Sequence, residues 1–599
     1  MRPQNWRSTA PVLIVVIILL SILFNADAFA DYHYASHTGS DEYPYTSWET
    51  AADSIQPAID TAEPGDTIYI GSGEYEEVIV MDAADSVMAF IGKGIDSTWI
   101  YTHQQMAHLV TSAHKSCWKD IHFSDFGEYS CIDAYGDVTF ENCLFSNTGW
   151  LANTILVDAS HVIVRNCIFE DLGGGGIVEF SINQSLEVSN CLFKNMNTEP
   201  LDMWSRHAVI KNNIILNVCG YPAFYFHYLS GYSFISISNN AIYNVCGGGI
   251  WITQIGDSTS QLANNTVDSA TAYIYWDPSV TVGPNFNWRI HNNSITNSDA
   301  GVRLQSDYLL SVHYCNLWRN LNDFWVPSGF YGEFDTTYGL LHVDPMFVDS
   351  TDFHLQAFSP LIDAGDPSVL DVDGTRSDIG AYGGPGGSSY GYQDLPPRIP
   401  DSLACRVWND TIYLDWRANY EADFFGYLLY RDTLSGFTPS DFNLIAEPDS
   451  SAFEDGGVVL GETYYYRIAS LDNQGNRSEY SPELPVEVTG AWDGEGAEMP
   501  RMTVIEANYP NPFNSATTIV YSVANLGPIP AQITIEIFDI MGRKVRTLVN
   551  ERKEAGIYRV IWDGRGDNNE AMSAGVYFAR ISQWGIGFMN KPRKLVLLK

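Results

Sequence analysis

The stretch ENCLFSN (residues 141–147) decides the fold, because it returns repeatedly along the chain. It recurs as RNCIFED (165–171), SNCLFKN (189–195), KNNIILN (211–217), SNNAIYN (238–244), ANNTVDS (263–269) and HNNSITN (291–297). The apolar runs inside each repeat are short and alternate as strands do, without a helical period. A repeat of about 24 residues with three short strands is typical of one rung of a parallel β-solenoid. We therefore expect an elongated β-solenoid.

Two columns of small polar residues accompany the repeat. Stacked rungs would place equivalent residues roughly 4.8 Å apart, so that asparagine amides can both donate and accept along the stack. We expect the first asparagine of successive repeats to stack, as at Asn166, Asn190 and Asn212. Cysteine fills the next position in several repeats, and most of the nine cysteines are expected to be free and buried. In particular, one unpaired column is expected from Cys143, Cys167 and Cys191, although stacked cysteines are also close enough to bridge.

The segments that flank the repeats point to a family. SIQPAIDTAEPGDTIYIGSGEYEE (54–77) predicts a short amphipathic helix that caps one end, and DPMFVDSTDFHLQAFSPLIDAGDP (344–367) with DVDGTRSDIGAYGG (371–384) predicts a closing segment. Together with the repeats, these segments resemble the right-handed parallel β-helix superfamily that includes pectate lyases and related carbohydrate-active proteins. The resemblance covers residues 31–392 and implies a right-handed solenoid.

Two further modules are predicted after a linker rich in glycine and proline (385–400). Residues 398–490 carry alternating strands and aromatic residues that resemble a fibronectin type III module, with Tyr464 as the expected corner tyrosine. Residues 499–599 resemble the C-terminal sorting domains of the type IX secretion system, and their turns independently predict a β-sandwich. The predicted fold class is therefore all-β, with a right-handed parallel β-helix followed by two β-sandwich modules.

The first 30 residues resemble a signal peptide. Arg2 and Arg7 precede the apolar run VLIVVIILLSILF (12–24), and AFA (28–30) fits a cleavage site. The run is short for a membrane span, so no transmembrane segment is expected after cleavage, although an uncleaved anchor is the alternative. With the sorting domain, this predicts a protein that is secreted or held on the outer surface of a Gram-negative-type bacterium, with the type IX secretion machinery as a partner.

The charge balance limits the ligands. Lys and Arg number 32 and Asp and Glu 72, which gives a net charge of −40. Such a surface repels nucleic acid, so no nucleic-acid partner is expected, whereas neutral sugars or cations suit it. Two interpretations of Asp371, Asp373 and Asp378 stay open. Their carboxylates offer oxygen ligands for calcium as a cofactor, or they form a structural closing turn.

A candidate site follows from the strand after each Asn-rich turn. Taking Val178, Leu201, Phe224 and Ile250 as inward residues, alternation sends their neighbours outward. The catalytic candidates on this face are Glu179, Asp202 and His227. The substrate-binding candidates are Trp204, Tyr225, Trp251, Trp276 and Arg303. Carboxylates one rung apart hold protons or calcium, and aromatic rings offer platforms for sugars.

We therefore expect a protein that binds or processes extracellular polysaccharide at the cell surface. If it is an enzyme, polysaccharide lyase or glycoside hydrolase chemistry is expected. The alternative is a structural or adhesive surface protein whose strand face carries no glycan site.

Overall fold

The computed structural model describes two compact units. These comprise residues 1–395 with 420–423, and residues 396–419 with 424–599. Structure is described for residues 31–598 except 82–87, 103–109, 113–114, 125–131, 148–152, 159–160, 180–184, 228–231, 253–254, 257–259, 271–279, 283–288, 305–308, 409, 489–502, 510, 512, 515, 524–530, 541–542, 555, 568–569 and 584–591. The expected signal peptide, Cys131 and Trp276 lie outside the described residues.

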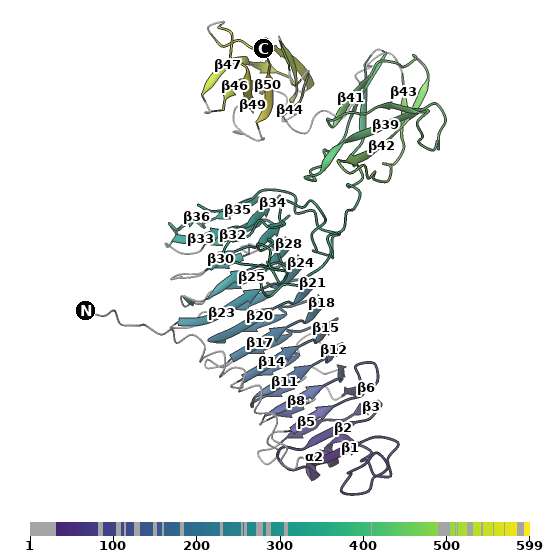
Figure 1. The fold of residues 1–599 in the computed structure, drawn as a ribbon, viewed down its shortest axis with the longest axis vertical. Coiled ribbons are helices and arrows are strands. Elements are labelled where there is room, and N and C mark those ends of the chain that lie inside the picture. The colour runs from purple at the N-terminus through teal and green to yellow at the C-terminus, as the bar shows by residue number, and fades with distance from the viewer. Residues whose placement is uncertain are drawn as a thin grey trace, which may run out of the picture. The chain divides into compact units, whose positions relative to one another are not determined.

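The first unit is a parallel β-solenoid with three long sheets, which confirms the predicted fold (Figure 1). Sheet 1 contains β1 (Tyr32–Ala35), β2 (Thr67–Ile70), β5 (Met88–Ile91), β8 (Ser116–Lys119), β11 (Val138–Glu141), β14 (His161–Arg165), β17 (Ser185–Ser189), β20 (His207–Lys211), β23 (Tyr232–Ser238), β27 (Gln261–Ala263), β30 (Arg289–His291), β33 (Leu309–His313) and β36 (Glu333–Asp335), with β26 (Ile255–Gly256) paired to β23. Sheet 2 contains β3 (Gly73–Glu76), β6 (Thr98–Tyr101), β9 (His122–Ser124), β12 (Leu144–Ser146), β15 (Ile168–Glu170), β18 (Leu192–Met196), β21 (Ile214–Val218), β24 (Ala241–Val245), β28 (Thr266–Ala270), β31 (Ser294–Thr296) and β34 (Asn316–Trp318). Sheet 3 contains β4 (Ile79–Met81), β7 (Val110–Ser112), β10 (Ile132–Ala134), β13 (Ile155–Val157), β16 (Ile177–Glu179), β19 (Leu201–Met203), β22 (Phe224–Phe226), β25 (Ile250–Ile252), β29 (Val280–Val282), β32 (Ala300–Leu304) and β35 (Asn322–Trp325).

Stacked apolar residues fill the inside of the solenoid. The central phenylalanines of the repeats pair in register from β9 to β18 and are fully buried. Adjacent rings stack at 5.2 Å for Phe123 and Phe145, 4.7 Å for Phe145 and Phe169, and 4.6 Å for Phe169 and Phe193. Each rung thus buries its own apolar residues against the next, so the repeats stabilise one another as neighbours.

The asparagine columns have two different roles. Asn166, Asn190 and Asn212 follow in-register residues of sheet 1 and stack as predicted, with φ near 55° at each. Asparagine tolerates this left-handed conformation, which other side chains rarely adopt. The buried amide ladder lies one residue further along, where Nδ2 of each residue donates to Oδ1 of the next at 2.9–3.0 Å. Its members are Asn213, Asn240, Asn265 and Asn293.

The cysteines differ between two positions of the rung. Cys143, Cys167 and Cys191 are buried and free, which confirms the expectation for this column. Cys219 and Cys246, which directly follow β21 and β24, form a disulfide. This bridge links neighbouring rungs and was not foreseen from the sequence.

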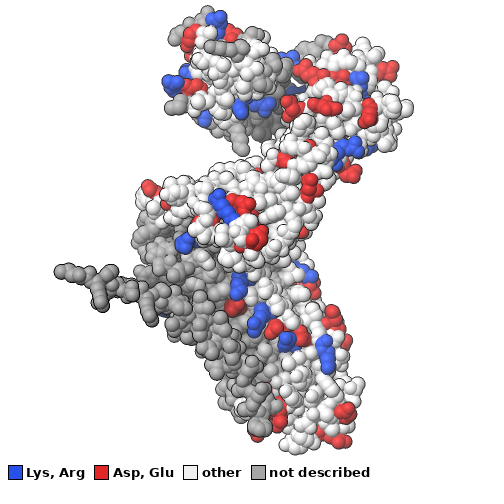
Figure 2. Space-filling view, viewed as in Figure 1, with Lys and Arg blue, Asp and Glu red and all other residues white. Residues whose placement is uncertain are grey.

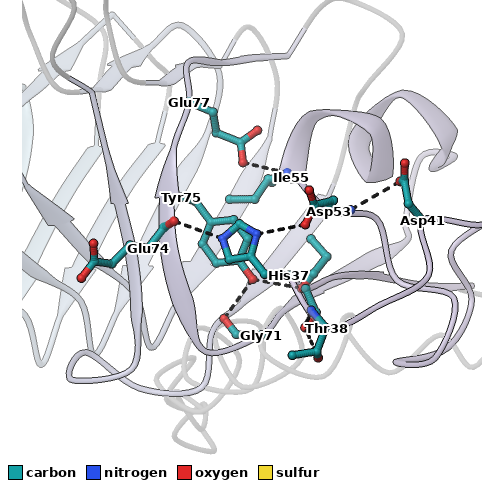
Figure 3. Close-up of polar contacts among 11 residues, drawn as sticks. His37, Thr38, Asp41, Asp53, Ile55, Gly71, Glu74, Tyr75 and Glu77 are labelled. Carbon is teal, nitrogen blue, oxygen red and sulfur yellow. Dashed lines mark hydrogen bonds and ion pairs between the residues drawn. The ribbon is translucent and has the colours of Figure 1, made fainter.

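A helix closes the N-terminal end of the solenoid, as predicted. It is α2 (Ile55–Thr61), which buries Ile55, Ala58 and Ile59. The Glu77 carboxylate accepts hydrogen bonds from the N–H groups of Ile55 and Gln56 at 2.8 and 3.1 Å, so it caps the helix from the end of β3 (Figure 3).

A histidine fixes the strand that leads into this cap. His37 stacks on Tyr75 at 4.5 Å, and its two ring nitrogens bond the Asp53 carboxylate and the Glu74 carbonyl (Figure 3). Burial lowers the pKa of His37, but these two bonds outweigh it and raise the pKa above its ordinary value. The cap is therefore held by packing and by charge-assisted hydrogen bonds.

The second unit contains two β-sandwich modules, as predicted. The first pairs β37 (Ala404–Trp408), β38 (Thr411–Asp415) and β41 (Ala452–Asp455) with the sheet β40 (Leu444–Ala446), β39 (Phe424–Asp432), β42 (Thr463–Asp472) and β43 (Leu484–Glu487) around one core. The second combines β44 (Val504–Tyr509), β45 (Thr517–Val523) and β48 (Gly556–Trp562) with β47 (Lys544–Lys553), β46 (Ala531–Asp539), β49 (Gly575–Gln583) and β50 (Arg593–Leu597). Within the described residues, no helix has the length and apolar character needed to cross a membrane.

Candidate functional site

The candidate site lies on the outer face of sheet 3. Its strands are three to five residues long and pair in parallel, so the residue between two inward side chains points outward in every rung. The outward column reads Asp133, Leu156, Val178, Asp202, Tyr225 and Trp251, and it continues beyond β29 with Arg303 and Trp325. These side chains therefore lie in one line across the rungs.

One predicted member of this column is misplaced by one residue. Val178, and not Glu179, pairs with Asp202, while Glu179 pairs with the inward-facing position of Val157. The cause is the tight turn before β16, where a Cβ on Gly176 would lie 2.3 Å from the Pro200 carbonyl oxygen. Because Gly176 runs against the next rung, the strand starts one residue earlier than expected. Glu179 and Asp202 therefore occupy different columns, whereas one column was expected.

Asp202 has a different partner, His227. The Nε2–H of His227 donates to Oδ1 of Asp202, across one rung. The backbone N–H of His227 donates to the carbonyl of Met203 at 2.9 Å and fixes the residue just after β22. With Nε2 bonded to the carboxylate, Nδ1 is the nitrogen left to exchange a proton.

Aromatic rings surround this pair. Trp204 stacks on His227 at 4.2 Å with an interplanar angle of 8°. Tyr225 contacts His227 at 4.1 Å and Trp251 at 5.0 Å. Trp204, Tyr225 and Trp251 are half-buried, so part of each ring faces outward. We call Asp202, Trp204, Tyr225, His227 and Trp251 the sheet 3 cluster.

A second carboxyl group, Glu199, belongs to the same place and was missed from the sequence. It lies in the turn before β19. Burial raises its pKa most, its own backbone N–H lowers it, the nearby Asp202 charge raises it, and His227 lowers it, with a net rise. Glu199 thus keeps its proton to a higher pH than an exposed glutamate does, beside an Asp–His pair. The string EPLD (199–202) contains the signal, because it places Glu199 three residues before Asp202, but strand alternation does not extend to this turn.

The remaining predicted residues lie outside the cluster. Arg303 is two rungs beyond Trp251 in the column, is only 3% exposed, and places its guanidinium 4.7 Å from the Trp325 ring. Trp276 is not among the described residues.

The three aspartates considered for calcium do not converge within ligating distance of one another. Asp371 accepts from the backbone N–H groups of Asp378 and Gly384, and Asp373 accepts from Thr375. Burial raises the pKa of Asp378 to about 6, although the N–H of Asp363 and the Tyr392 hydroxyl donate to it. These carboxylates hold the turns of the closing segment together.

Several charges on the described part of sheet 1 are paired across rungs. Ion pairs join Lys119 to Glu141 at 3.3 Å and Lys211 to Glu187 at 3.1 Å. Figure 2 shows basic and acidic side chains interspersed along this side of the solenoid. This pattern differs from the basic stripe that a nucleic-acid-binding surface needs.

Comparisons with known proteins agree with the modular organisation. A family model described as a right handed beta helix region matches residues 76–215 and 133–287, and a FlgD Ig-like domain model matches residues 522–585. No curated protein matches the chain.

Several solved structures are similar to parts of the chain. A fibronectin III-like protein from Clostridium thermocellum is 28% identical, with 15% of this chain and 92% of that chain covered and a TM-score of 0.13. Dimeric latent PorU from Porphyromonas gingivalis is 14% identical over 34% of this chain and 20% of that chain, with a TM-score of 0.19. A structure of the FN1–FN3 domains of chicken CNTN1 is 10% identical, with 35% of this chain and 70% of that chain covered and a TM-score of 0.14.

Proposed function

We propose that the solenoid binds an extracellular polysaccharide across the sheet 3 cluster and processes it there. The observation that carries the proposal is the Asp202–His227 pair enclosed by Trp204, Tyr225 and Trp251. Half-buried aromatic rings beside a few convergent polar groups are typical of ligand sites. A line of such rings across stacked rungs suits a linear polymer better than a compact metabolite.

The polar groups supply the chemistry. His227, oriented by Asp202, acts as the base through Nδ1, and Glu199, whose pKa is raised, acts as the acid. An acid and a base on one face suit hydrolysis of a glycosidic bond in a neutral polymer. They suit β-elimination by a lyase only in an acidic polymer, whose uronate carboxyl group acidifies the proton that is removed. The net charge of −40 favours a neutral polymer, because an anionic one would need a cation or a local basic patch.

A panel of neutral and acidic polysaccharides tests this proposal. Binding is measured together with reducing ends and the absorbance of unsaturated products. We expect Trp204→Ala and Trp251→Ala each to weaken binding roughly fivefold or more, since an aromatic contact contributes about 1 kcal/mol beyond its buried area. Trp99→Ala is the matched control, because Trp99 is 37% exposed on sheet 2.

Two outcomes would count against a glycan site. One is that no polysaccharide binds the wild-type protein. The other is that Trp99→Ala weakens binding as much as the two cluster variants do. Either outcome favours a structural or adhesive surface protein instead.

We further propose that the protein is exported and that residues 499–599 direct passage across the outer membrane. The resemblance of this module to type IX sorting domains supports the proposal, and solenoids with immunoglobulin-like modules are typical of extracellular proteins. Removing residues 499–599 is expected to leave a folded solenoid, since the solenoid core is separate from the core of that module, and to retain it in the periplasm. Cell fractionation with surface labelling checks this, and normal surface delivery of the truncated protein would refute it.

A further inference from the structure

A second surface of the solenoid is only half covered. On sheet 2, the first residue of successive strands forms an outward column in register, continuous from β12 to β34. It reads Leu144, Ile168, Leu192, Ile214, Ala241, Thr266, Ser294 and Asn316. The last four are buried, with Phe353 and Ala381 packed on Ala241, whereas the first four are partly exposed and Ile214 reaches 37%. The covering element is the closing segment (residues 344–392).

The closing segment binds through its backbone. Asn264 Nδ2 donates to the carbonyl of Asp378 at 3.0 Å, and Asn239 Nδ2 donates to the carbonyls of Ala381 and Gly383 at 2.9 and 2.6 Å. These asparagines belong to the stacked column with φ near 55°. Asn264 and Asn292 also donate to the Ser377 hydroxyl, each at 3.1 Å. The column therefore binds the closing segment mainly, but not solely, through main-chain carbonyl groups.

The same contacts demand glycine. A Cβ on Gly384 would lie 2.7 Å from Asn264 Oδ1, and a Cβ on Gly386 would lie 2.7 Å from Asn239 Oδ1. Real Cβ atoms do not approach so closely, and Gly384 also has a φ of 74°. Glycine at these two positions lets the segment lie directly against the asparagine side chains, whose amides also reach the carbonyls of Asp378 and Ala381.

Beyond the closing segment, the column of left-handed asparagines and the outward column of sheet 2 continue uncovered. Asn166, Asn190 and Asn212 occupy the next positions of the column, and their side-chain amides make no hydrogen bond with the described residues. Each stands two residues before a partly exposed aliphatic residue, namely Ile168, Leu192 or Ile214. We call these six residues the Asn groove.

The far end of the Asn groove is hollowed. A hollow of about 330 Å³ is lined by Asn166 and Ile168 together with Asn142 and the loop 93–97. The groove thus runs from this hollow to the edge of the closing segment, over three consecutive rungs.

We propose that the Asn groove docks an extended, glycine-rich peptide segment of a partner protein. The groove presents amide donors at the same left-handed positions as the surface that already holds the closing segment. It continues the same outward column, with larger apolar residues where the covered part has Ala241, Thr266, Ser294 and Asn316. The occupant offers main-chain carbonyls to Asn166, Asn190 and Asn212 and packs small side chains on Ile168, Leu192 and Ile214. This inference is independent of the glycan site, which lies on sheet 3.

The test uses the full chain and a fluorescent synthetic peptide with the sequence of residues 376–387, RSDIGAYGGPGG. The key variant is Asn190→Gly, because glycine keeps the left-handed backbone and removes only the amide. We expect the variant to bind the peptide about fivefold more weakly, as the loss of one neutral hydrogen bond implies. Leu192→Ser is expected to weaken binding as well, and a peptide with alanine in place of its glycines is expected not to bind.

Asn147→Gly is the control, because Asn147 also has a left-handed φ, of 53°. It directly follows β12, whereas the asparagines of the Asn groove precede their strands of sheet 2. It should bind like the wild-type protein, and circular dichroism should show all variants folded. The proposal is overturned if the peptide does not bind at about 1 mM, or if Asn190→Gly binds it as well as wild type. It is also overturned if a glycan, and not the peptide, loses affinity in Asn190→Gly, since the groove would then be a sugar site.

Discussion

Asp202→Asn is expected to lower polysaccharide turnover at least a hundredfold while the solenoid stays folded. The neutral amide of this variant would place no charge opposite His227 and can turn its NH₂ group toward Nε2, which favours the tautomer with the proton on Nδ1 and so removes the base. General acid–base groups typically contribute a factor of roughly 10² to 10⁴. Initial rates of product formation, at equal protein concentration, measure the effect.

The pH profile should change in the same variant. The charge of Asp202 is one of the causes that raise the pKa of Glu199, so its removal lowers that pKa. A general acid is active while protonated, and activity then falls as pH rises through its pKa. The alkaline limb of the profile should therefore move to lower pH in Asp202→Asn.

Asp158→Asn is the matched control for this prediction. Asp158 is an exposed carboxylate that directly follows β13, two rungs before the rung of Trp204, and lies outside the cluster. Its substitution should leave both turnover and the pH profile unchanged. A wild-type protein that releases no product from any glycan, or an Asp202→Asn variant with full turnover, contradicts the catalytic role.

Phe169→Ala is expected to destabilise the solenoid by about 3–5 kcal/mol, the usual loss for a buried phenylalanine. Phe169 is fully buried and stacks between Phe145 and Phe193 at 4.7 and 4.6 Å, so its removal leaves a cavity between two rungs. Because rungs stabilise their neighbours, the loss should spread along the solenoid and spare the second unit.

Chemical denaturation followed by hydrogen exchange checks this expectation. Phe358→Ala makes the same chemical change at a side chain that is 52% exposed, so it should cost far less. A loss below about 1 kcal/mol for Phe169→Ala would contradict the stacked core.

The repeat predicts most of the fold because each rung copies the register of the last. Asp202, Tyr225 and Trp251 come together for this reason, as their strands pair without an offset. Trp204 and His227 follow two residues later and stack as the alternation implies. Strand periodicity thus carries enough information to place side chains of different rungs on one face.

Turns are where the sequence analysis fails. The glycine turn before β16 is one residue shorter than assumed, which moves Glu179 out of the column, and Glu199 lies in a turn that strand alternation does not describe. The disulfide is a second feature that the spacing of the repeat does not predict. Cys219 and Cys246 are 27 residues apart, about one rung, but a similar spacing separates the cysteines at 143, 167 and 191, which stay free. Side-chain direction at the turn decides between the two outcomes, and spacing alone does not contain it.

A structure of the protein with a bound oligosaccharide from the best polymer of the panel would show whether the sheet 3 cluster is the binding site. We expect sugar rings against Trp204, Tyr225 and Trp251, with a glycosidic oxygen within hydrogen-bonding distance of His227 or Glu199. An oligosaccharide bound to sheet 1, to sheet 2 or to the second unit, with the sheet 3 cluster free, would contradict this expectation.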